Sequence, residues 1–357
     1  MLDVYLIIQS DWRMKQRGIN YDVGTKRLSG GLTRENFLLD DVKFELNIIT
    51  NTLHCNAVRI SGQDIQRIVL ASEIALQSGM TVWFSPALQY ASQADTMYYL
   101  IRAAGAAEKL RLQYGNLVFV AGCELSLFTE GFIKGDTGEK RMSSLFSPLS
   151  ILKNKIGLKR SYNKRLNRFL KRAVNILKEH FGGKIAYASG TWEKIEWENF
   201  DFVGIDHYRA LYNKASYRDE LRNYISKGKP LSIMEFGCCT YHGASDKGAM
   251  GWAIIDWTKA KPELKGKFSR DEKEQSDYIA DLLQVFQTEG VFAAFVFTFM
   301  TGNYIYSDDP RFDLDLASYG IVKVISDRRE GYEKQVPWVP KLAFYRLGKI
   351  YSELSGK

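Results

Sequence analysis

Two glutamates, Glu124 and Glu235, are the residues of this sequence best suited to chemistry. Glu124 follows the apolar run LVFVAGC and Glu235 follows LSIM, and neither has an acidic neighbour in the chain. Because burying an unpaired carboxylate is costly, they are either a functional pair or two structural acids that pair with Arg59 or Arg209. Two facing carboxylates suit glycoside hydrolysis, in which one protonates the leaving oxygen and the other attacks or stabilises the oxocarbenium-like centre.

The elements that would position these carboxylates alternate along the chain. Short runs rich in β-branched and aromatic residues are followed by longer helical patterns, which is typical of βα units around a parallel sheet. The predicted strands span Gln16–Tyr21, Ala57–Ser61, Thr81–Pro86, Leu117–Cys123, Lys184–Ala188, Phe202–Tyr208, Leu231–Phe236 and Ala293–Phe299. The predicted helices lie near Arg34–Thr50, Asp64–Ser78, Ala94–Gln113, Tyr162–His180, Ser216–Lys227, Asp271–Thr288 and Lys341–Leu354.

These βα units predict an α/β fold of the (β/α)₈ TIM-barrel class, in which the carboxyl ends of the strands carry the active site. A doubly wound sheet is the alternative, but the segment RGINYDVG lacks the GxGxxG turn that usually follows its first strand. No Pro/Gly/Ser linker divides the 357 residues. We therefore expect one catalytic barrel domain over residues 1–357, with a basic helical insertion around 150–180 and a rim loop around 300–320.

Composition indicates a globular, soluble protein, because 45% of the residues are hydrophobic and only 7 are proline. The opening MLDVYLIIQS carries an acid and a short apolar run, unlike a secretory signal. No stretch approaches the roughly 20 apolar residues that a membrane-spanning helix needs. We expect a cytoplasmic protein with no membrane partner.

The net charge of +8 is concentrated in the segment from Lys153 to Lys178. Such a segment is either a surface for nucleic acid or acidic lipid, or the solvated face of a barrel helix. Apolar residues at helical spacing favour the second interpretation, so we expect no nucleic-acid partner. These residues are Leu166, Leu170, Val174 and Leu177.

The cysteines and the acidic rim segment are weak candidates for metal ligands. Cys123, Cys238, Cys239 and a histidine could in principle form a site and make hydrolysis metal-dependent, but no CxxC or HExxH spacing supports one. The segment SDDPRFDLDLASYG lacks the glycine and closing glutamate of an EF-hand loop. We expect no metal and no cofactor, and we predict a loop over the barrel mouth from which Asp313 or Asp315 reaches the substrate.

Further polar and aromatic residues at the strand ends could bind a sugar. Aromatic rings stack on the apolar C–H faces of sugars, although each of these aromatic residues fits core packing equally well. Asp206 and His207 could bind hydroxyls or form a hydrogen-bonded pair on the rim. The candidates are Asp22, Asp206, His207, Trp192, Tyr241 and Trp252.

A glutamate ending strand four and another ending strand seven in MEFG resemble the pattern of the clan A glycoside hydrolases, and the whole chain fits that clan. The segments RGINYDVGT, LHCNAVRISG, GCELSLF, DFVGIDHYR and EFGCCTY also look like a group of bacterial (β/α)₈ proteins labelled abortive infection proteins. That label names no chemistry.

The clan resemblance implies roles for the residues at matching positions. Glu124 would be the general acid/base and Glu235 the nucleophile, with Arg59 positioning Glu235 and Tyr208 hydrogen-bonding it. A cation and a donor would keep Glu235 ionised, while an apolar surrounding would keep Glu124 protonated. The resemblance thus implies a retaining hydrolase of a β-linked, or stereochemically equivalent, carbohydrate substrate.

The sequence departs from the clan pattern at two places. Cys123 stands where the clan has an Asn that contacts the sugar 2-hydroxyl, and Phe297–Met300 replaces a Trp at the end of strand eight. Both departures bear on the identity of the substrate more than on the reaction. The alternative function is a non-catalytic carbohydrate-binding or phage-defence protein on a hydrolase scaffold, and the sequence indicates no oligomeric state.

Overall fold

A computed structural model describes residues 14–26, 31–145, 147, 161–325 and 337–356 of the chain. Parallel strands close into a barrel in which β1 pairs with both β2 and β10. The order around the barrel is β1 (Gln16–Asp22), β10 (Ala293–Val296), β7 (Leu231–Phe236), β6 (Val203–Asp206), β5 (Lys184–Gly190), β4 (Leu117–Cys123), β3 (Thr81–Pro86) and β2 (Ala57–Gly62). The predicted (β/α)₈ barrel is confirmed.

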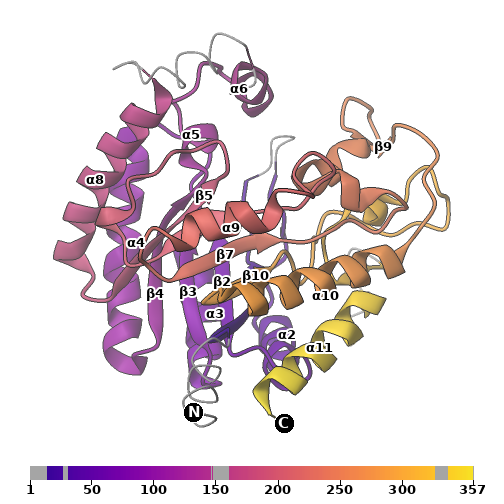
Figure 1. The fold of residues 1–357 in the computed structure, drawn as a ribbon, viewed down its shortest axis with the longest axis horizontal. Coiled ribbons are helices and arrows are strands. Elements are labelled where there is room, and N and C mark those ends of the chain that lie inside the picture. The colour runs from indigo at the N-terminus through magenta and orange to yellow at the C-terminus, as the bar shows by residue number, and fades with distance from the viewer. Residues whose placement is uncertain (1–13, 27–30, 146, 148–160, 326–336, 357) are drawn as a thin grey trace.

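Helices surround the barrel and connect its strands (Figure 1). The long ones are α2 (Leu39–Asn51), α3 (Ile65–Gln77), α4 (Gln93–Tyr114), α8 (Tyr162–His180), α9 (Tyr217–Ile225), α10 (Glu272–Glu289) and α11 (Leu342–Ser355). Several begin at side-chain caps: Asp64, Ser92, Ser161 and Asp271 each accept a hydrogen bond from a backbone N–H of the first turn. Among the described residues, no helix is long and apolar enough to cross a membrane.

Short elements lie at the end of the barrel where the strands finish, opposite the two chain termini in Figure 1. They are α5 (Leu125–Phe128), α6 (Gly138–Leu145), η2 (Ala244–Asp246), η3 (Gly248–Ile254), η4 (Leu314–Ala317) and the strand pairs β8 (Ile255–Asp256) with β9 (Glu263–Leu264) and β11 (Val322–Val324) with β12 (Trp338–Pro340). A further short helix, η1 (Trp197–Asn199), lies at the other end, where Lys229 before β7 donates to the carbonyl of Glu198 at 3.1 Å. None of these elements was predicted, because each is too short to show a hydrophobic period.

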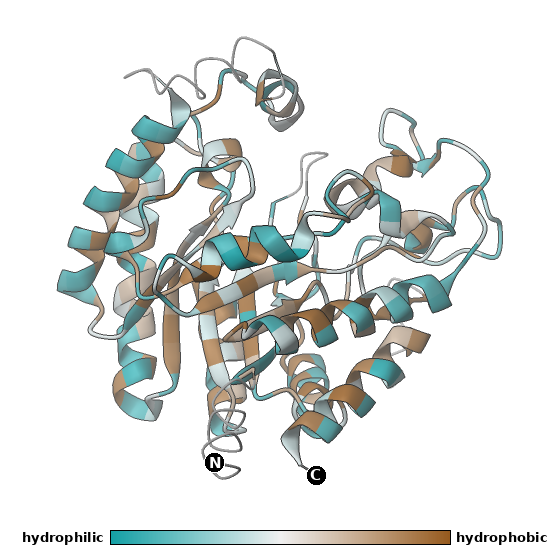
Figure 2. Ribbon diagram, viewed as in Figure 1, coloured by the Kyte–Doolittle hydropathy of each residue, from teal (hydrophilic) through white to brown (hydrophobic). Residues whose placement is uncertain are grey.

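The core has two layers. An inner cluster fills the barrel around Trp83, Phe202 and Phe295, and Trp83 donates a hydrogen bond from Nε1 to Gln16 Oε1 at 2.7 Å. A larger cluster lies between the strands and the helices, whose outer faces are mostly hydrophilic (Figure 2). On α8, Leu166 and Leu170 are buried, whereas basic residues such as Lys164 and Lys171 are exposed. Residues 162–180 of the basic segment thus form the helix that joins β4 to β5.

Some predicted boundaries differ from the structure. The helix predicted from Arg34 begins at Leu39, because Arg34 is buried and its guanidinium contacts Glu45 Oε2 and the Tyr21 hydroxyl, both at 2.9 Å. The strand predicted to reach Phe299 ends at Val296, because Thr298 turns to hydrogen-bond with the segment from 319 to 321. Both boundaries are thus set by contacts with residues outside the local hydrophobic pattern.

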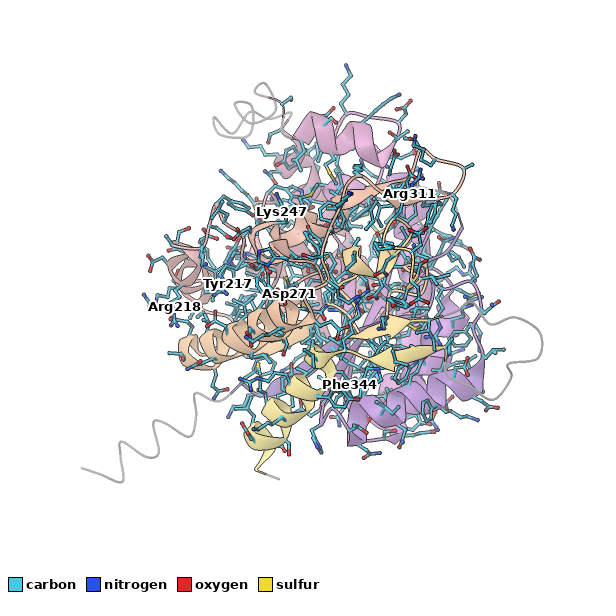
Figure 3. The ribbon with its side chains drawn as sticks, turned by 90° about the vertical axis from the view of Figure 1, so that its right-hand side faces the viewer. Tyr217, Arg218, Lys247, Asp271, Arg311 and Phe344 are labelled. Carbon is cyan, nitrogen blue, oxygen red and sulfur yellow. The ribbon has the colours of Figure 1, made fainter. Side chains whose placement is uncertain are left out.

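A buried ion-pair network fixes the rim segment after β10. Arg270 contacts Asp313 Oδ2 at 2.7 Å and Asp315 Oδ2 at 2.9 Å, and Lys341 Nζ lies 2.8 Å from Asp315 Oδ1. Lys341 is completely buried, and Arg270 directly precedes Asp271, the cap of α10. The network therefore joins the rim segment to the starts of α10 and α11, which Figure 3 marks by Asp271 and Phe344.

Replacing Lys341 by methionine should lower the free energy of unfolding by about 3 kcal/mol, because the buried Asp315 would lose its fully buried cation and keep only the partly exposed Arg270. Urea unfolding measures this change. Lys349, which is exposed on the same helix, provides the matched control. Lys349→Met should change the stability by less than about 0.5 kcal/mol, and equal effects of the two substitutions would contradict the role given to the network.

Candidate active site

Glu235 is held on both sides of its carboxylate at the end of β7. Arg59 on β2 donates from Nη1 to Glu235 Oε1 at 2.9 Å, and the hydroxyl of Tyr208 donates to Oε2 at 3.1 Å. Arg59 is only 2% exposed. A buried cation and a hydroxyl donor thus orient this carboxylate.

Polar groups from neighbouring strands fix Arg59 in turn. Its Nη1 lies 3.2 Å from Asn20 Oδ1 on β1, and its Nε donates to Ser85 Oγ on β3 at 3.2 Å. Asn20 also donates to the carbonyl of Met234 at 2.9 Å, next to Glu235. The guanidinium is therefore bound by three strands besides its own, which preorganises the pair that it makes with Glu235.

Tyr208 keeps its proton. Burial and the charge of Glu235 raise the pKa of its phenol well above the usual range. The phenol is therefore a hydrogen-bond donor to Glu235 throughout the physiological pH range.

Glu124 directly follows β4 and has a different environment. Its backbone is left-handed, with φ of 47°, and its N–H donates to the carbonyl of Ala188 on β5 at 2.9 Å. Burial and the charges of Asp206, Glu235 and Glu193 raise the pKa of the Glu124 carboxyl well above its usual range. The two glutamates therefore lie in different electrostatic environments at the same end of the barrel.

Asp206 and Cys123 complete the cluster around Arg59. Cys123 Sγ lies 3.5 Å from Asp206 Oδ2 and 3.7 Å from Glu235 Oε1, and Asp206 Oδ1 lies 3.9 Å from Arg59 Nη1. Burial and the charge of Glu235 raise the pKa of Asp206 well above its usual range, and burial raises that of the Cys123 thiol. Buried, negatively charged surroundings thus oppose the ionisation of Asp206 as they do that of Glu124.

Within the part of the chain that the structure describes, two groups of side chains have atoms close enough to share a cation. Cys123, Asp206 and Glu235 form the first, but Arg59 already brings a positive charge to the same Glu235 oxygen. His242, Asp271 and Glu274 form the second, in which Asp271 caps α10 and Glu274 accepts backbone N–H groups at 2.7 and 2.8 Å.

The cysteine cluster considered from the sequence does not form among the described residues. Cys239 donates to the carbonyl of Ala317 at 3.1 Å, and both Cys238 and Cys239 are buried in the core. Cys123 lies apart from them, in the group with Asp206 and Glu235.

The structure brings Asp206 into the cluster but not its neighbour His207. The ring of His207 stacks on Tyr217 of α9, with centroids 4.4 Å apart, and its Nε2 lies 3.4 Å from Glu220 Oε2. Burial lowers the pKa of His207 to about 4, so the ring is neutral at pH 7. The predicted rim pair of Asp206 and His207 does not form, because the two side chains point to opposite sides of the chain.

Other predicted residues are engaged in contacts of their own. Asp313 is bound to Arg270, and Asp22 accepts hydrogen bonds from the hydroxyls of Thr25 and Thr33. Tyr241 is buried and donates to the carbonyl of Gly251 at 3.1 Å. The structure does not join these three to the cluster of Glu235.

The predicted aromatic platforms lie in different places. Trp192 is partly exposed and donates from Nε1 to Ser126 Oγ at 3.0 Å, close to the turn that carries Glu124. Trp252 is partly buried against the outer core cluster. Of the two, only Trp192 has a contact that joins it to the described site.

Comparisons with known proteins reveal likeness in structure. No protein-family profile and no curated protein sequence matches the chain. A GH113 β-1,4-mannanase superposes with a TM-score of 0.61 at 12% identity over 95% of this chain and 99% of the other. The GH113 β-mannanase of Alicyclobacillus acidocaldarius in complex with ManMIm has a TM-score of 0.58 at 12% identity, with 95% and 97% covered. The family 5 glycoside hydrolase of Prevotella bryantii has a TM-score of 0.51 at 13% identity, with 96% and 97% covered.

These likenesses establish the fold. The chain shares its (β/α)₈ barrel with solved glycoside hydrolases over nearly its full length. At 12–13% identity the comparison does not transfer a substrate. What the site does must be argued from its own side chains.

Several residues of the site had no role assigned from the sequence. Asn20 and Ser85 hold Arg59, and Glu193 accepts the backbone N–H of Ser126, two residues after Glu124, at 3.0 Å. All three are polar residues at or after strand ends, and this position alone could have marked them as candidates for the site. Their partners lie on other strands, so their roles could not be assigned from spacing alone.

Proposed function

We propose that the protein is a glycoside hydrolase with Glu124 as general acid/base and Glu235 as nucleophile. The observation that carries this proposal is the clamp on Glu235 by Arg59 and Tyr208, at the same end of the barrel as Glu124, whose pKa burial raises. One carboxylate is oriented by a cation and a hydroxyl donor, and the surroundings of the other favour its protonated form. This division is what acid-assisted cleavage of a glycosidic bond requires.

The reaction that fits these states is a double displacement. Glu235 attacks the anomeric carbon while Glu124 gives its proton to the leaving oxygen, so that the glycosidic bond breaks as a glycosyl ester forms. Glu124, now ionised, takes a proton from a water molecule that attacks the ester. The sugar leaves as a hemiacetal, and both carboxyl groups return to their initial states.

The proposed substrate is a β-linked, or stereochemically equivalent, glycoside of short length, acted on from its end in the cytoplasm. The solved neighbours bear the names of β-mannanases and a family 5 glycoside hydrolase, which supports a carbohydrate substrate. Trp192, close to the turn of Glu124, is the aromatic residue best placed to stack on a sugar ring.

A panel of nitrophenyl pyranosides and furanosides tests the proposed function, with release of nitrophenol as the measurement. Activity that is present in the wild type and lost in Glu235→Ala supports the assignment, and activity that survives the substitution refutes it. Proton NMR of the first product anomer then decides the stereochemistry. Retention supports the double displacement, and inversion would make Glu235 a general base.

The alternative, a non-catalytic carbohydrate-binding or phage-defence protein, draws on the exposed basic side chains of α8 and on the resemblance to proteins labelled abortive infection proteins. That resemblance stays a prediction. The alternative function would be favoured by a salt-dependent gel shift of labelled nucleic acid. This shift should be lost when the exposed basic residues of α8 are neutralised, namely Lys164, Arg168, Lys171 and Arg172.

A further inference from the structure

Glu193 is a buried carboxyl group behind the turn that carries Glu124. It follows β5, is 5% exposed and accepts the N–H of Ser126 at Oε1, 3.0 Å away. Its Oε2 accepts the hydroxyl of Tyr187 at 2.8 Å, and that hydroxyl oxygen accepts the N–H of Leu125 at 2.9 Å. Glu193 and Tyr187 together therefore hold the two backbone N–H groups that follow Glu124.

The turn needs such support. Glu124 has a left-handed backbone, which is unfavourable for a residue with a side chain, and its own side chain does not cap the short helix that follows. Trp192 reinforces the arrangement, because it donates to Ser126 Oγ at 3.0 Å and its carbonyl accepts the hydroxyl of Tyr162 at 3.0 Å. The loop after β5 thus supports the backbone turn that carries Glu124.

Glu193 also acts on Glu124 through its charge. The titratable groups that face it are Tyr187 on β5, Tyr162 on α8, Glu124 after β4 and Asp206 on β6. Among the described residues, no cation forms an ion pair with Glu193. Burial raises the pKa of Glu193 to about 6, and its ionised form in turn raises the pKa of Glu124.

We propose that Glu193 is the positioning residue of Glu124, which places this acid through the backbone N–H groups of Leu125 and Ser126. The assignment of Glu124 as the acid rests on the proposed function. The charge of Glu193 provides a readout of this arrangement: removing that charge makes ionisation of Glu124 easier. Glu124 then loses its proton at a lower pH.

Infrared titration tests the charge effect without relying on activity. The carbonyl stretch of protonated Glu124 is identified as the band that Glu124→Gln removes. In Glu193→Gln this band should titrate lower by about one pH unit. The matched control is Glu198→Gln, because Glu198 is exposed in the same loop, and it should leave the band unchanged. An unchanged band in Glu193→Gln, or an equal shift in the control, would overturn the charge effect.

Tyr187→Phe tests the positioning effect. It removes the acceptor of the Leu125 N–H together with the donor to Glu193 Oε2, and it keeps the Glu193 carboxyl group and its bond to the Ser126 N–H. We expect kcat to fall by about tenfold or more with little change in KM. The alkaline limb of the pH profile should not move to lower pH, as we expect it to do in Glu193→Gln. Wild-type kcat in this variant would refute the positioning role. Failure of the proposed function is distinguishable, because it would leave the wild type inactive while the infrared titration still reports on Glu193.

Discussion

Glu235→Ala is expected to lower kcat for a nitrophenyl glycoside by about 10⁴-fold or more, because the substitution removes the carboxylate that forms the glycosyl ester. Cys123 Sγ lies 3.7 Å from Glu235 Oε1, but burial raises the pKa of its thiol well above the usual range. The thiol therefore cannot substitute for the carboxylate at neutral pH. Steady-state kinetics against the wild type measures the loss.

Azide should restore part of this activity. Alanine leaves a space beside Arg59, whose guanidinium would have lost its carboxylate partner and can bind a small anion. An azide ion in that space attacks the anomeric carbon from the side that Glu235 occupied. The product would be a glycosyl azide of inverted configuration, which NMR identifies.

Glu130→Ala provides the matched control for this experiment. Glu130 is an exposed glutamate that also follows β4, beyond α5. Its substitution should leave kcat within about twofold of the wild type, since exposed positions away from a site seldom affect function. If Glu235→Ala retained wild-type kcat, or if azide gave a glycosyl azide of retained configuration, Glu235 would not be the nucleophile.

The sequence was sufficient to predict the barrel and the positions of Glu124 and Glu235 at the ends of its strands. Apolar runs of strand length that end in Glu124 or Glu235 place these residues at the carboxyl ends of parallel strands. Arg59 lies inside such a run on β2, where an unpaired cation would be unfavourable, so a carboxylate partner could be expected. In each case a local pattern carried the information.

Other features depend on contacts that no local pattern records. Asp313 was expected to reach the substrate, but it pairs with Arg270, which lies 43 positions earlier in the chain. His207 follows Asp206 directly and still packs against α9 instead of joining the cluster. Glu193 contacts the turn after β4 by accepting the N–H of Ser126, and it also accepts the hydroxyl of Tyr187 on β5.

Glu124→Ala should slow hydrolysis according to the leaving group. For an alkyl glycoside, whose leaving oxygen needs a proton, kcat/KM should fall by about 10²–10⁴-fold. For a dinitrophenyl glycoside, which leaves as a stable anion, formation of the glycosyl ester should continue at close to the wild-type rate. Comparison of the two substrates in both proteins measures the dependence.

The pH profile distinguishes loss of this acid from general damage to the site. In the wild type, activity with the alkyl glycoside should fall as the pH rises through the raised pKa of Glu124, because only the protonated acid can assist departure. Without Glu124 this alkaline limb should disappear. An equal loss for both leaving groups, or an alkaline limb that persists in Glu124→Ala, would mean that another group supplies the proton. Asp206, whose pKa is also raised and which lies 3.5 Å from Cys123, would then be the residue to replace next.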